Sequence, residues 1–163
     1  MKEQKILEIL EVMNRTILKL SKNEKISDEE LDQLQNTIEA LHNEKNLQEN
    51  NNLSLERRIS SVYLKNVPTN LKGYKYLRFA IILTYKGYAG TSITQELYPM
   101  VAQKYNVTPA KVERSIRHAI EVGWNNGMGT DENITKMFSV FKNKPTNSHF
   151  ISAVANDMKL NDI

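Results

Sequence analysis

Apolar residues recur at helical spacing along most of the chain, and no segment shows the apolar–polar alternation of a half-buried strand. In residues 3–21 the apolar positions repeat with the spacing 4-3-4-3, and in residues 28–41 they repeat with the spacing 3-4-3. Both patterns are typical of heptad seams, in which one stripe of a helix packs against another helix. Because a polar stretch at residues 21–25 separates them, the two segments predict a helical hairpin.

The apolar seams of this hairpin require a surface to pack against, because each helix is too short to be stable alone. The seams can meet each other, the downstream part of the chain, or a second copy of the protein. We favour self-association, and packing within a single chain is the alternative. The residues expected at a dimer interface are Ile6, Leu10, Met13, Ile17, Leu31, Leu34, Ile38 and Leu41.

A polar, asparagine-rich stretch at residues 43–52 follows the hairpin, and it is either a frayed helix end or a linker. We therefore place a domain boundary here, with residues 1–53 as the hairpin and residues 54–163 as a second domain. Ser54 is expected to cap the first helix of the second domain, and Pro68 is expected to stop that helix. The periodic segments downstream predict about six helices, so we expect an all-α protein.

The second domain is organised around residues 107–127, which read VTPAKVERSIRHAIEVGWNNG. Thr108 can cap a helix, and Pro109 suits the first helical position because its missing N–H is not needed there. One stripe of this helix is apolar and contains Val112, Ile116, Ala119 and Gly123, with Ile120 at its flank. A short helical pattern at residues 97–106 precedes it across a three-residue turn, which is the layout of a helix-turn-helix motif.

Three other helices are predicted around this motif. The first ends at Gly87 and Gly90, and its face is formed by Tyr74, Leu77, Ile81, Thr84 and Tyr88. A short helix capped by Asp131 carries the apolar residues Ile134, Met137, Phe138 and Phe141. Asn147 is expected to cap a last helix, whose apolar positions are Phe150, Ile151, Val154, Ala155 and Met158.

The charge distribution separates the two halves of the chain. Residues 1–53 carry 7 basic and 11 acidic side chains, whereas residues 54–163 carry 15 basic and 8 acidic ones. A basic second half suggests that this half meets a polyanion. With no cysteine, no secretory signal pattern and no membrane-spanning apolar run, a cytoplasmic protein without membrane contact is expected. Because no enzyme motif occurs, we expect no catalytic activity, no cofactor and no metal site.

The face opposite the apolar stripe of the 109–125 helix carries Lys111, Arg114, Arg117 and His118. These side chains favour contact with nucleic acid, although charged residues on amphipathic helices are also commonly just solvated. Glu113 lies four residues before Arg117, so it either orients that arginine or accepts a hydrogen bond from a base. His118 is either a buried, hydrogen-bonded ring or a further contact to DNA.

Several stretches of the second domain match a known family in order and spacing. They are VP at 67–68, KGYKYLR at 72–78, SIT at 92–94, LYP at 97–99, KVERSIRHAIEV at 111–122 and KPTNSHFISAVA at 144–155. Residues 55–160 therefore resemble the effector-domain family of the stage zero sporulation protein A response regulators. The resemblance implies a six-helix domain that contains a helix-turn-helix motif and binds double-stranded DNA. Residues 1–53 do not match the family's receiver domain, because they predict helices and lack strand-ending aspartates, so control by aspartyl phosphorylation is not expected.

The resemblance also implies which residues meet DNA. Base contacts are expected from Glu113, Arg114, Arg117, Lys111 and His118, with Arg114 first because arginine donates two hydrogen bonds to guanine. Phosphate contacts are expected from Thr94, Thr108 and Lys144. We therefore expect a sequence-specific regulator that binds duplex DNA as a dimer, with RNA polymerase or a full-length sporulation regulator as further candidate partners. The alternative is a protein-interaction module that antagonises a full-length sporulation regulator by mixed pairing or by competition for its sites.

Overall fold

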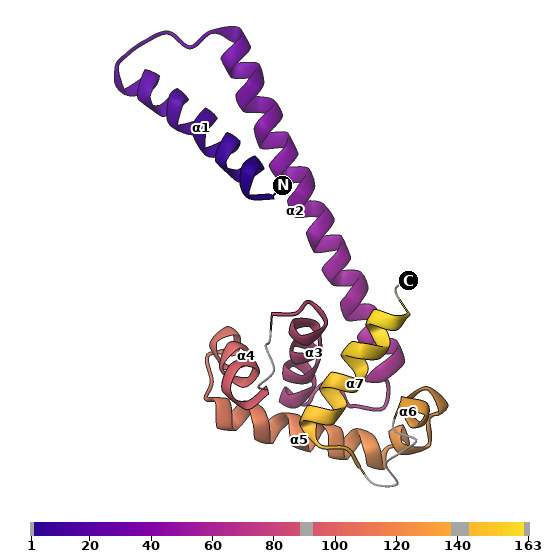
Figure 1. The fold of residues 1–163 in the computed structure, drawn as a ribbon. Coiled ribbons are helices and arrows are strands. Elements are labelled where there is room, and N and C mark those ends of the chain that lie inside the picture. Colours follow the sequence, from indigo (N-terminus) through magenta and orange to yellow (C-terminus); the bar gives the residue numbers. More distant parts are fainter. Residues whose placement is uncertain (1, 89–92, 138–143, 162–163) are drawn as a thin grey trace. The chain divides into compact units, whose positions relative to one another are not determined.

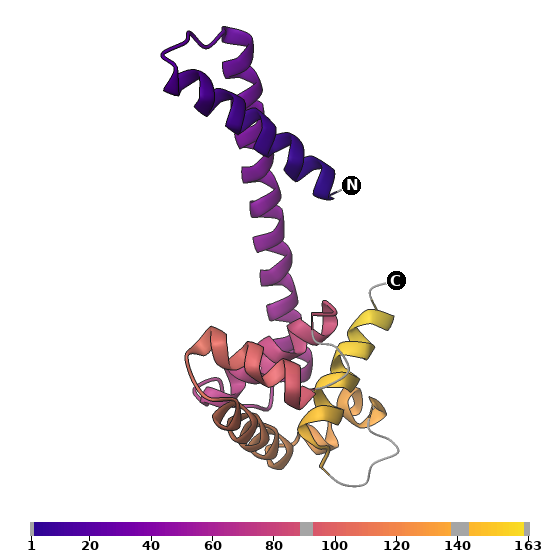
Figure 2. The same ribbon diagram turned by 60° about the vertical axis from the view of Figure 1, so that its left-hand side comes forward.

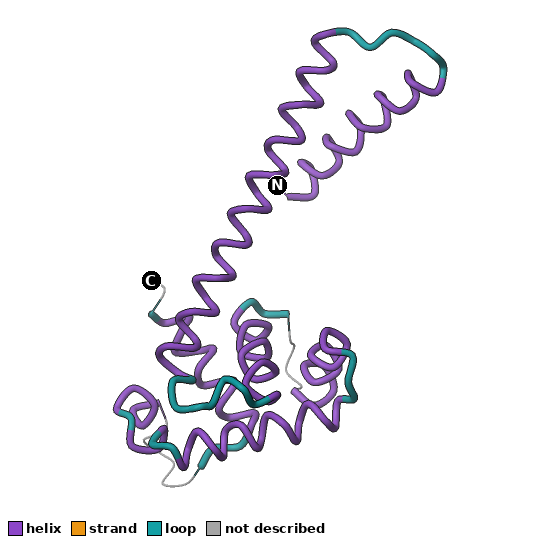
Figure 3. Tube along the Cα trace, turned by 180° about the vertical axis from the view of Figure 1, so that it is seen from behind, coloured by secondary structure: helices purple, strands orange, loops and turns teal. Residues whose placement is uncertain are grey.

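The computed structural model describes residues 2–88, 93–137 and 144–161. Across these ranges every regular element is a helix and no strand is present, as Figure 3 shows, so the prediction of an all-α fold is confirmed. The chain divides into two compact units, Met1–Asn52 and Leu53–Ile163. In the part of the chain that the structure describes, no helix combines the length and the apolar character needed to cross a membrane.

The first unit contains the helix α1 (Lys2–Ser21) and most of the helix α2 (Asp28–Arg58). The chain runs along α1 to the joining loop and returns along α2, so both helices lie on the same side of that loop (Figures 1 and 2). Ser27 caps α2, because the Glu30 N–H donates to Ser27 Oγ over 3.3 Å and the Ser27 N–H donates to Glu30 Oε2 over 3.0 Å. This reciprocal arrangement is a capping box, and it satisfies donors that the first turn of the helix leaves unpaired. Lys19 of α1 also forms an ion pair with Glu30, which ties the end of α1 to the start of α2.

The helix α2 is longer than the sequence pattern predicts. It runs without interruption through the asparagine-rich residues 43–52, so this stretch is helical and is not a frayed helix end. Ser54 lies inside the helix, and the prediction that it caps a new helix is wrong. Asparagine costs less than about 1 kcal/mol in a helix, and the stretch contains no proline or glycine that would stop propagation.

No side chain that the structure describes between residues 7 and 52 is buried. A groove of about 350 Å³ lies between α1 and α2, and its lining residues are Glu8, Ile9, Val12, Gln33, Asn36, Thr37 and Ala40. None of the described residues that were expected at a dimer interface lines this groove. Leu34 is half-buried, and the Ile6 side chain lies outside the described part of the structure. The other six expected residues are exposed, namely Leu10, Met13, Ile17, Leu31, Ile38 and Leu41. The described side chains of residues 7–52 therefore form no core of their own.

The second unit contains five further α-helices, two short π-helical segments and one 3-10 turn within its described ranges. In chain order they are η1 (Ile59–Tyr63), α3 (Lys72–Tyr85), η2 (Ile93–Leu97), α4 (Tyr98–Tyr105), α5 (Pro109–Asn125), η3 (Met128–Thr130), α6 (Glu132–Met137) and α7 (Asn147–Leu160). The helix α5 packs against α3, α4 and α7, which lie along one side of it in Figure 1. The core between these helices includes the fully buried residues Leu77, Ile81, Ile116, Phe150 and Ile151.

Close contact between α3 and α5 depends on a glycine. A Cβ atom at Gly73 would lie 1.9 Å from the carbonyl oxygen of Ser115 and 2.8 Å from the Cβ of Ala119. Any side chain at position 73 would therefore force the two helices apart. Since α5 carries the candidate DNA-binding residues, this contact helps to determine where they lie.

Two predictions about the ends of helices are wrong, and others concern residues that the structure does not describe. The helix α3 ends at Tyr85, and Gly87 follows it with a φ of +73°, so Tyr88 is 65% exposed and does not extend the apolar face. Thr146 caps α7 by accepting a hydrogen bond from the His149 N–H, whereas Asn147, the predicted cap, is the first helical residue. Phe138, Phe141, Gly90 and the side chain of Met137 lie outside the described residues.

Candidate nucleic-acid interface

A tight turn between α4 and α5 builds the helix-turn-helix motif. Asn106 ends α4 in the left-handed conformation with a φ of 51°, a region that asparagine tolerates better than most residues. Thr108 Oγ1 then accepts a hydrogen bond from the Lys111 N–H over 3.3 Å, and Pro109 occupies the first helical position. The sequence predicted both the cap and the turn, and the structure confirms them.

The apolar stripe of α5 is buried over its whole length. Val112, Ile116 and Ala119 have no exposed surface, Ile120 is 1% exposed, and Gly123 is also buried. Because successive helical residues differ by about 100° in direction, the residues opposite this stripe must face outwards. The predicted anchoring of α5 from behind is therefore confirmed.

Three cationic or titratable side chains lie on the outward face of α5 without an ion-pair partner among the described residues. They are Lys111, Arg114 and His118, and each is exposed. The alternative in which His118 is a buried ring is therefore wrong. Each of these side chains can meet a ligand without first breaking a salt bridge to the rest of the described chain.

Arg117 differs from these neighbours, because it forms an ion pair with Glu113 one turn earlier in α5. The Arg117 side chain is 65% exposed and that of Glu113 is 33% exposed. This contact is the orienting arrangement that the spacing of the two residues allows. It leaves one edge of the guanidinium open to solvent, while the carboxylate offsets its charge.

Lys144 lies just before α7 and faces α5. Its Nζ is 3.3 Å from Glu121 Oε1, and the two side chains are 35% and 51% exposed. Lys144 thus stays at the surface near the C-terminal half of α5. Exposed pairs of this kind contribute little to stability, so Lys144 can exchange Glu121 for another anion at small cost.

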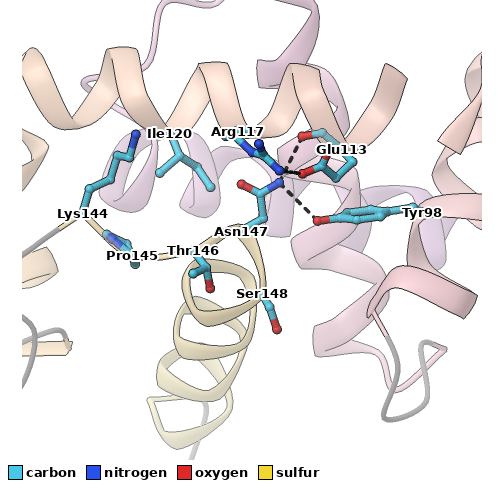
Figure 4. A pocket seen from close by; sticks show the side chains of 9 residues that line it. All are labelled: Tyr98, Glu113, Arg117, Ile120, Lys144, Pro145, Thr146, Asn147 and Ser148. Carbon is cyan, nitrogen blue, oxygen red and sulfur yellow. Dashed lines mark hydrogen bonds and ion pairs between the residues drawn. The ribbon is translucent and has the colours of Figure 1, made fainter. Parts of the chain in front are cut away.

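Asn147 is a residue of this site that the sequence did not identify. It is 8% exposed, and its Nδ2 donates to Tyr98 Oη over 3.1 Å and to the Glu113 carbonyl oxygen over 3.0 Å (Figure 4). Burial raises the pKa of the Tyr98 hydroxyl above its ordinary value, at which the group is already protonated at neutral pH. Thr146 and Asn147 are consecutive residues just before the last apolar pattern, and both residue types are good helix N-caps. The sequence pattern alone therefore does not show which of the two caps the helix.

A pocket of about 380 Å³ opens between α4, α5 and the start of α7 (Figure 4). It is lined by Tyr98, Glu113, Arg117, Ile120, Lys144, Pro145, Thr146, Asn147 and Ser148. Arg117 and Lys144 lie at the same pocket, so residues far apart in sequence contribute to one polar surface. The described ranges contain no group of three side chains arranged to hold a metal ion.

The predicted phosphate contacts occupy three different places. Thr108 is exposed at the start of α5, and Lys144 borders the pocket. Thr94 lies within η2, and its side chain is outside the described part of the structure. Contact of these residues with phosphate, and of the α5 face with bases, stays a prediction.

Comparison with protein-family models identifies a family that matches most of the second unit. The model of the family described as sporulation initiation factor Spo0A C terminal matches residues 59–158, which is more than half of the chain. The matched segment runs from the start of η1 nearly to the end of α7. It therefore includes the helix-turn-helix motif, the pocket and Asn147.

Proposed function

The chain belongs to the family of Spo0A C-terminal domains, which are DNA-binding effector domains of sporulation regulators, and we propose that it binds a specific duplex sequence through α5. The observation that carries this proposal is the exposed cationic face of a helix whose opposite stripe is fully buried. A rigid helix of this kind fits the major groove, where base edges present distinct hydrogen-bonding patterns. Sequence recognition thus comes from the side chains of α5, and transcription control follows from where the protein binds.

Arg114 is the principal base-contacting residue in this proposal. It is exposed in the N-terminal half of α5, between the buried residues Val112 and Ile116, and has no ion-pair partner among the described residues. In helix-turn-helix proteins, the N-terminal part of the second helix contacts base edges. A guanidinium group in that position can donate two hydrogen bonds to O6 and N7 of guanine.

The remaining residues of the site divide between bases and phosphates. Lys111, His118 and the open edge of Arg117 extend the base-contacting face along α5. Thr108, Thr94 and Lys144 contact phosphates, since helix starts and lysine side chains at the edge of the motif are well suited to the DNA backbone. Phosphate contacts position the protein, whereas the α5 side chains provide the discrimination.

The test of this proposal is Arg114→Ala, assayed on a duplex selected from random DNA with the full chain. We expect a loss of about 1–3 kcal/mol on the selected duplex and relaxed preference at one base pair. Lys159→Ala is the matched control, because Lys159 is an exposed cation in the last turn of α7, away from α5. Equal losses on selected and scrambled duplexes would contradict a base-contacting role.

We further propose that the protein binds DNA as a dimer held by its first unit. Of the thirteen large apolar side chains that the structure describes as exposed, ten lie in the first unit, between Leu7 and Leu47. A unit with this surface, and with no buried side chain among its described residues 7–52, cannot offset the conformational entropy of its own ordering, which is about 1–2 kcal/mol per residue. A partner surface must therefore complete its core.

The charges of the hairpin favour a second copy as that partner. Residues 2–27 carry six basic and four acidic side chains, whereas residues 28–52 carry one basic and seven acidic ones. Opposite charges flanking apolar seams select partners and orientation in helical assemblies. We therefore propose that α1 of one copy packs against α2 of the other. In a symmetric dimer this contact forms twice.

Ile17→Glu tests the dimer, since Ile17 is 58% exposed on the α1 seam. We expect sedimentation equilibrium of the full chain to change from a dimer to a monomer, with weaker binding to DNA carrying two sites. The control is Leu160→Glu, which adds the same charge at an apolar residue that is 72% exposed in the second unit. A wild-type chain that stays monomeric at millimolar concentration would remove the dimer from the proposal.

The alternative function is a protein-interaction module that antagonises a full-length sporulation regulator. The observation that favours it is the same exposed apolar hairpin, which can pair with another protein as well as with itself. A gel shift with the selected duplex and a pull-down with a full-length relative distinguish the two functions. DNA binding by this chain alone at nanomolar concentration supports the regulator, whereas pairing without DNA binding supports the antagonist. RNA polymerase is a further candidate partner for the regulator once it is bound to DNA.

A further inference from the structure

We propose, building on the DNA-binding role of α5 proposed above, that Asn147 is a positioning residue that holds the helix-turn-helix motif in its DNA-binding geometry. Asn147 belongs to neither helix of the motif, since it is the first residue of α7. Its side chain nevertheless joins both of them, because one amide group donates to Tyr98 of α4 and to Glu113 of α5 (Figure 4). The angle between α4 and α5 is thereby tied to a third helix.

Both donors of the Asn147 amide are used in these contacts. The Nδ2–Oη distance to Tyr98 is 3.1 Å and the Nδ2–O distance to Glu113 is 3.0 Å, which are ordinary hydrogen-bond lengths. The residue is 8% exposed, so its hydrogen bonds lie where water competes poorly. An alanine at this position would leave the Tyr98 hydroxyl without its Asn147 donor and would remove the hydrogen bond from α7 to the Glu113 carbonyl of α5.

The contact with Glu113 lies at the part of α5 that matters most for DNA. Glu113 precedes Arg114, the proposed base-contacting residue, and its carboxylate holds Arg117. Asn147 binds the Glu113 main-chain carbonyl, so it acts on the helix backbone from which both arginines extend. Functional groups must be held within about 0.5 Å of their productive positions, and a shift of this carbonyl moves both arginines together.

The experiment compares Asn147→Ala with Val154→Ala in the full chain. Val154 has no exposed surface and lies in the same helix, so its substitution destabilises the core without touching the network around Asn147. Binding is measured at a temperature at which both variants remain folded by circular dichroism. The probes are the duplex selected from random DNA with the unaltered protein and a scrambled duplex of the same length.

We expect Asn147→Ala to bind the selected duplex about tenfold more weakly and the scrambled duplex less than about threefold more weakly. Val154→Ala is expected to keep the unaltered ratio between the two duplexes even if its melting temperature falls further. Tyr98→Phe, which removes one of the two hydrogen-bond partners, should reduce the ratio by an intermediate amount. In a double-mutant cycle, Tyr98→Phe should have little further effect once Asn147 is alanine.

The positioning role is overturned if Asn147→Ala and Val154→Ala show the same ratio of affinity for the selected duplex to affinity for the scrambled duplex. Such a result leaves the proposed function intact, because the unaltered protein would still select a sequence. If instead the unaltered protein enriches no sequence from random DNA, the proposed function fails, and the positioning role fails with it. The selection and the ratio thus separate the two failures.

Discussion

Replacement of Glu113 by glutamine separates the two roles that this residue can have in DNA binding. The substitution removes the negative charge and keeps the size of the side chain and the main-chain carbonyl that Asn147 contacts. If Glu113 acts by orienting and partly neutralising Arg117, the variant has one more uncompensated cation on the outward face of α5. If Glu113 accepts a hydrogen bond from a cytosine amino group, the variant instead loses discrimination at one base pair.

The expected size of the effect follows from the contacts of the pair. Both members are part-exposed, with side chains 65% and 33% accessible, so losing the pair costs the fold about 0.5 kcal/mol or less. The freed Arg117 can neutralise one further phosphate, which makes the slope of log K against log salt more negative by about 0.9. Over a fourfold range of salt, this change alters the affinity ratio between Glu113→Gln and the unaltered protein by about 3.5-fold.

The assay is a salt titration of binding to a scrambled duplex and to the selected duplex, for both proteins. We expect tighter binding of Glu113→Gln to the scrambled duplex at low salt, together with the steeper slope. Thermal melting should show almost unchanged stability, which excludes unfolding as the cause. An unchanged slope combined with relaxed preference at a single base pair would refute the orienting role and favour direct contact of Glu113 with a base.

Two further predictions follow from ion pairs of the structure. Lys144→Ala should weaken binding to all duplexes alike and make the slope of log K against log salt shallower by about 1. Glu121→Gln, which frees Lys144 from its ion pair, should have the opposite effect. A loss of affinity for the selected duplex alone in Lys144→Ala would contradict a phosphate contact. The hydrogen bond from Lys19, and then that from the Ser27 N–H, lower the pKa of Glu30 from 4.5 to about 2. Because the folded pKa is the lower one, the Glu30 contribution to hairpin stability is complete above pH 4.5 and is lost as the pH falls towards 2. Circular dichroism at 222 nm should therefore show a loss of helix between these pH values. Glu30→Gln should reduce this loss, whereas the control Glu29→Gln, which leaves the contacts of Glu30 with Lys19 and Ser27 in place, should not. Identical acid profiles for the two variants would contradict the assignment of the helix loss to Glu30.

The extent of sequence-based prediction differs between features of this protein. The stripe from Val112 to Gly123, the Thr108 cap and the α4–α5 turn follow from local spacing, and all three are present in the structure. The continuity of α2 through residues 43–52 was missed, because a run of asparagines lowers helix propensity without a residue that stops the helix. The cap of α7 was misplaced by one residue, because Thr146 and Asn147 have nearly equal capping strength.

The sequence by itself determined the helical class, the amphipathic character of α5 and the identity of the cations on its outward face. These properties depend on residues a few positions apart, whose relative directions are set by the 3.6-residue turn of the helix. Only the tertiary structure decided that Asn147 joins Tyr98 and Glu113, that Lys144 reaches Glu121, and that the hairpin residues Leu10 and Ile38 stay exposed. Such contacts join residues distant in sequence, so they depend on the angles at which whole helices pack, and no local pattern contains those angles.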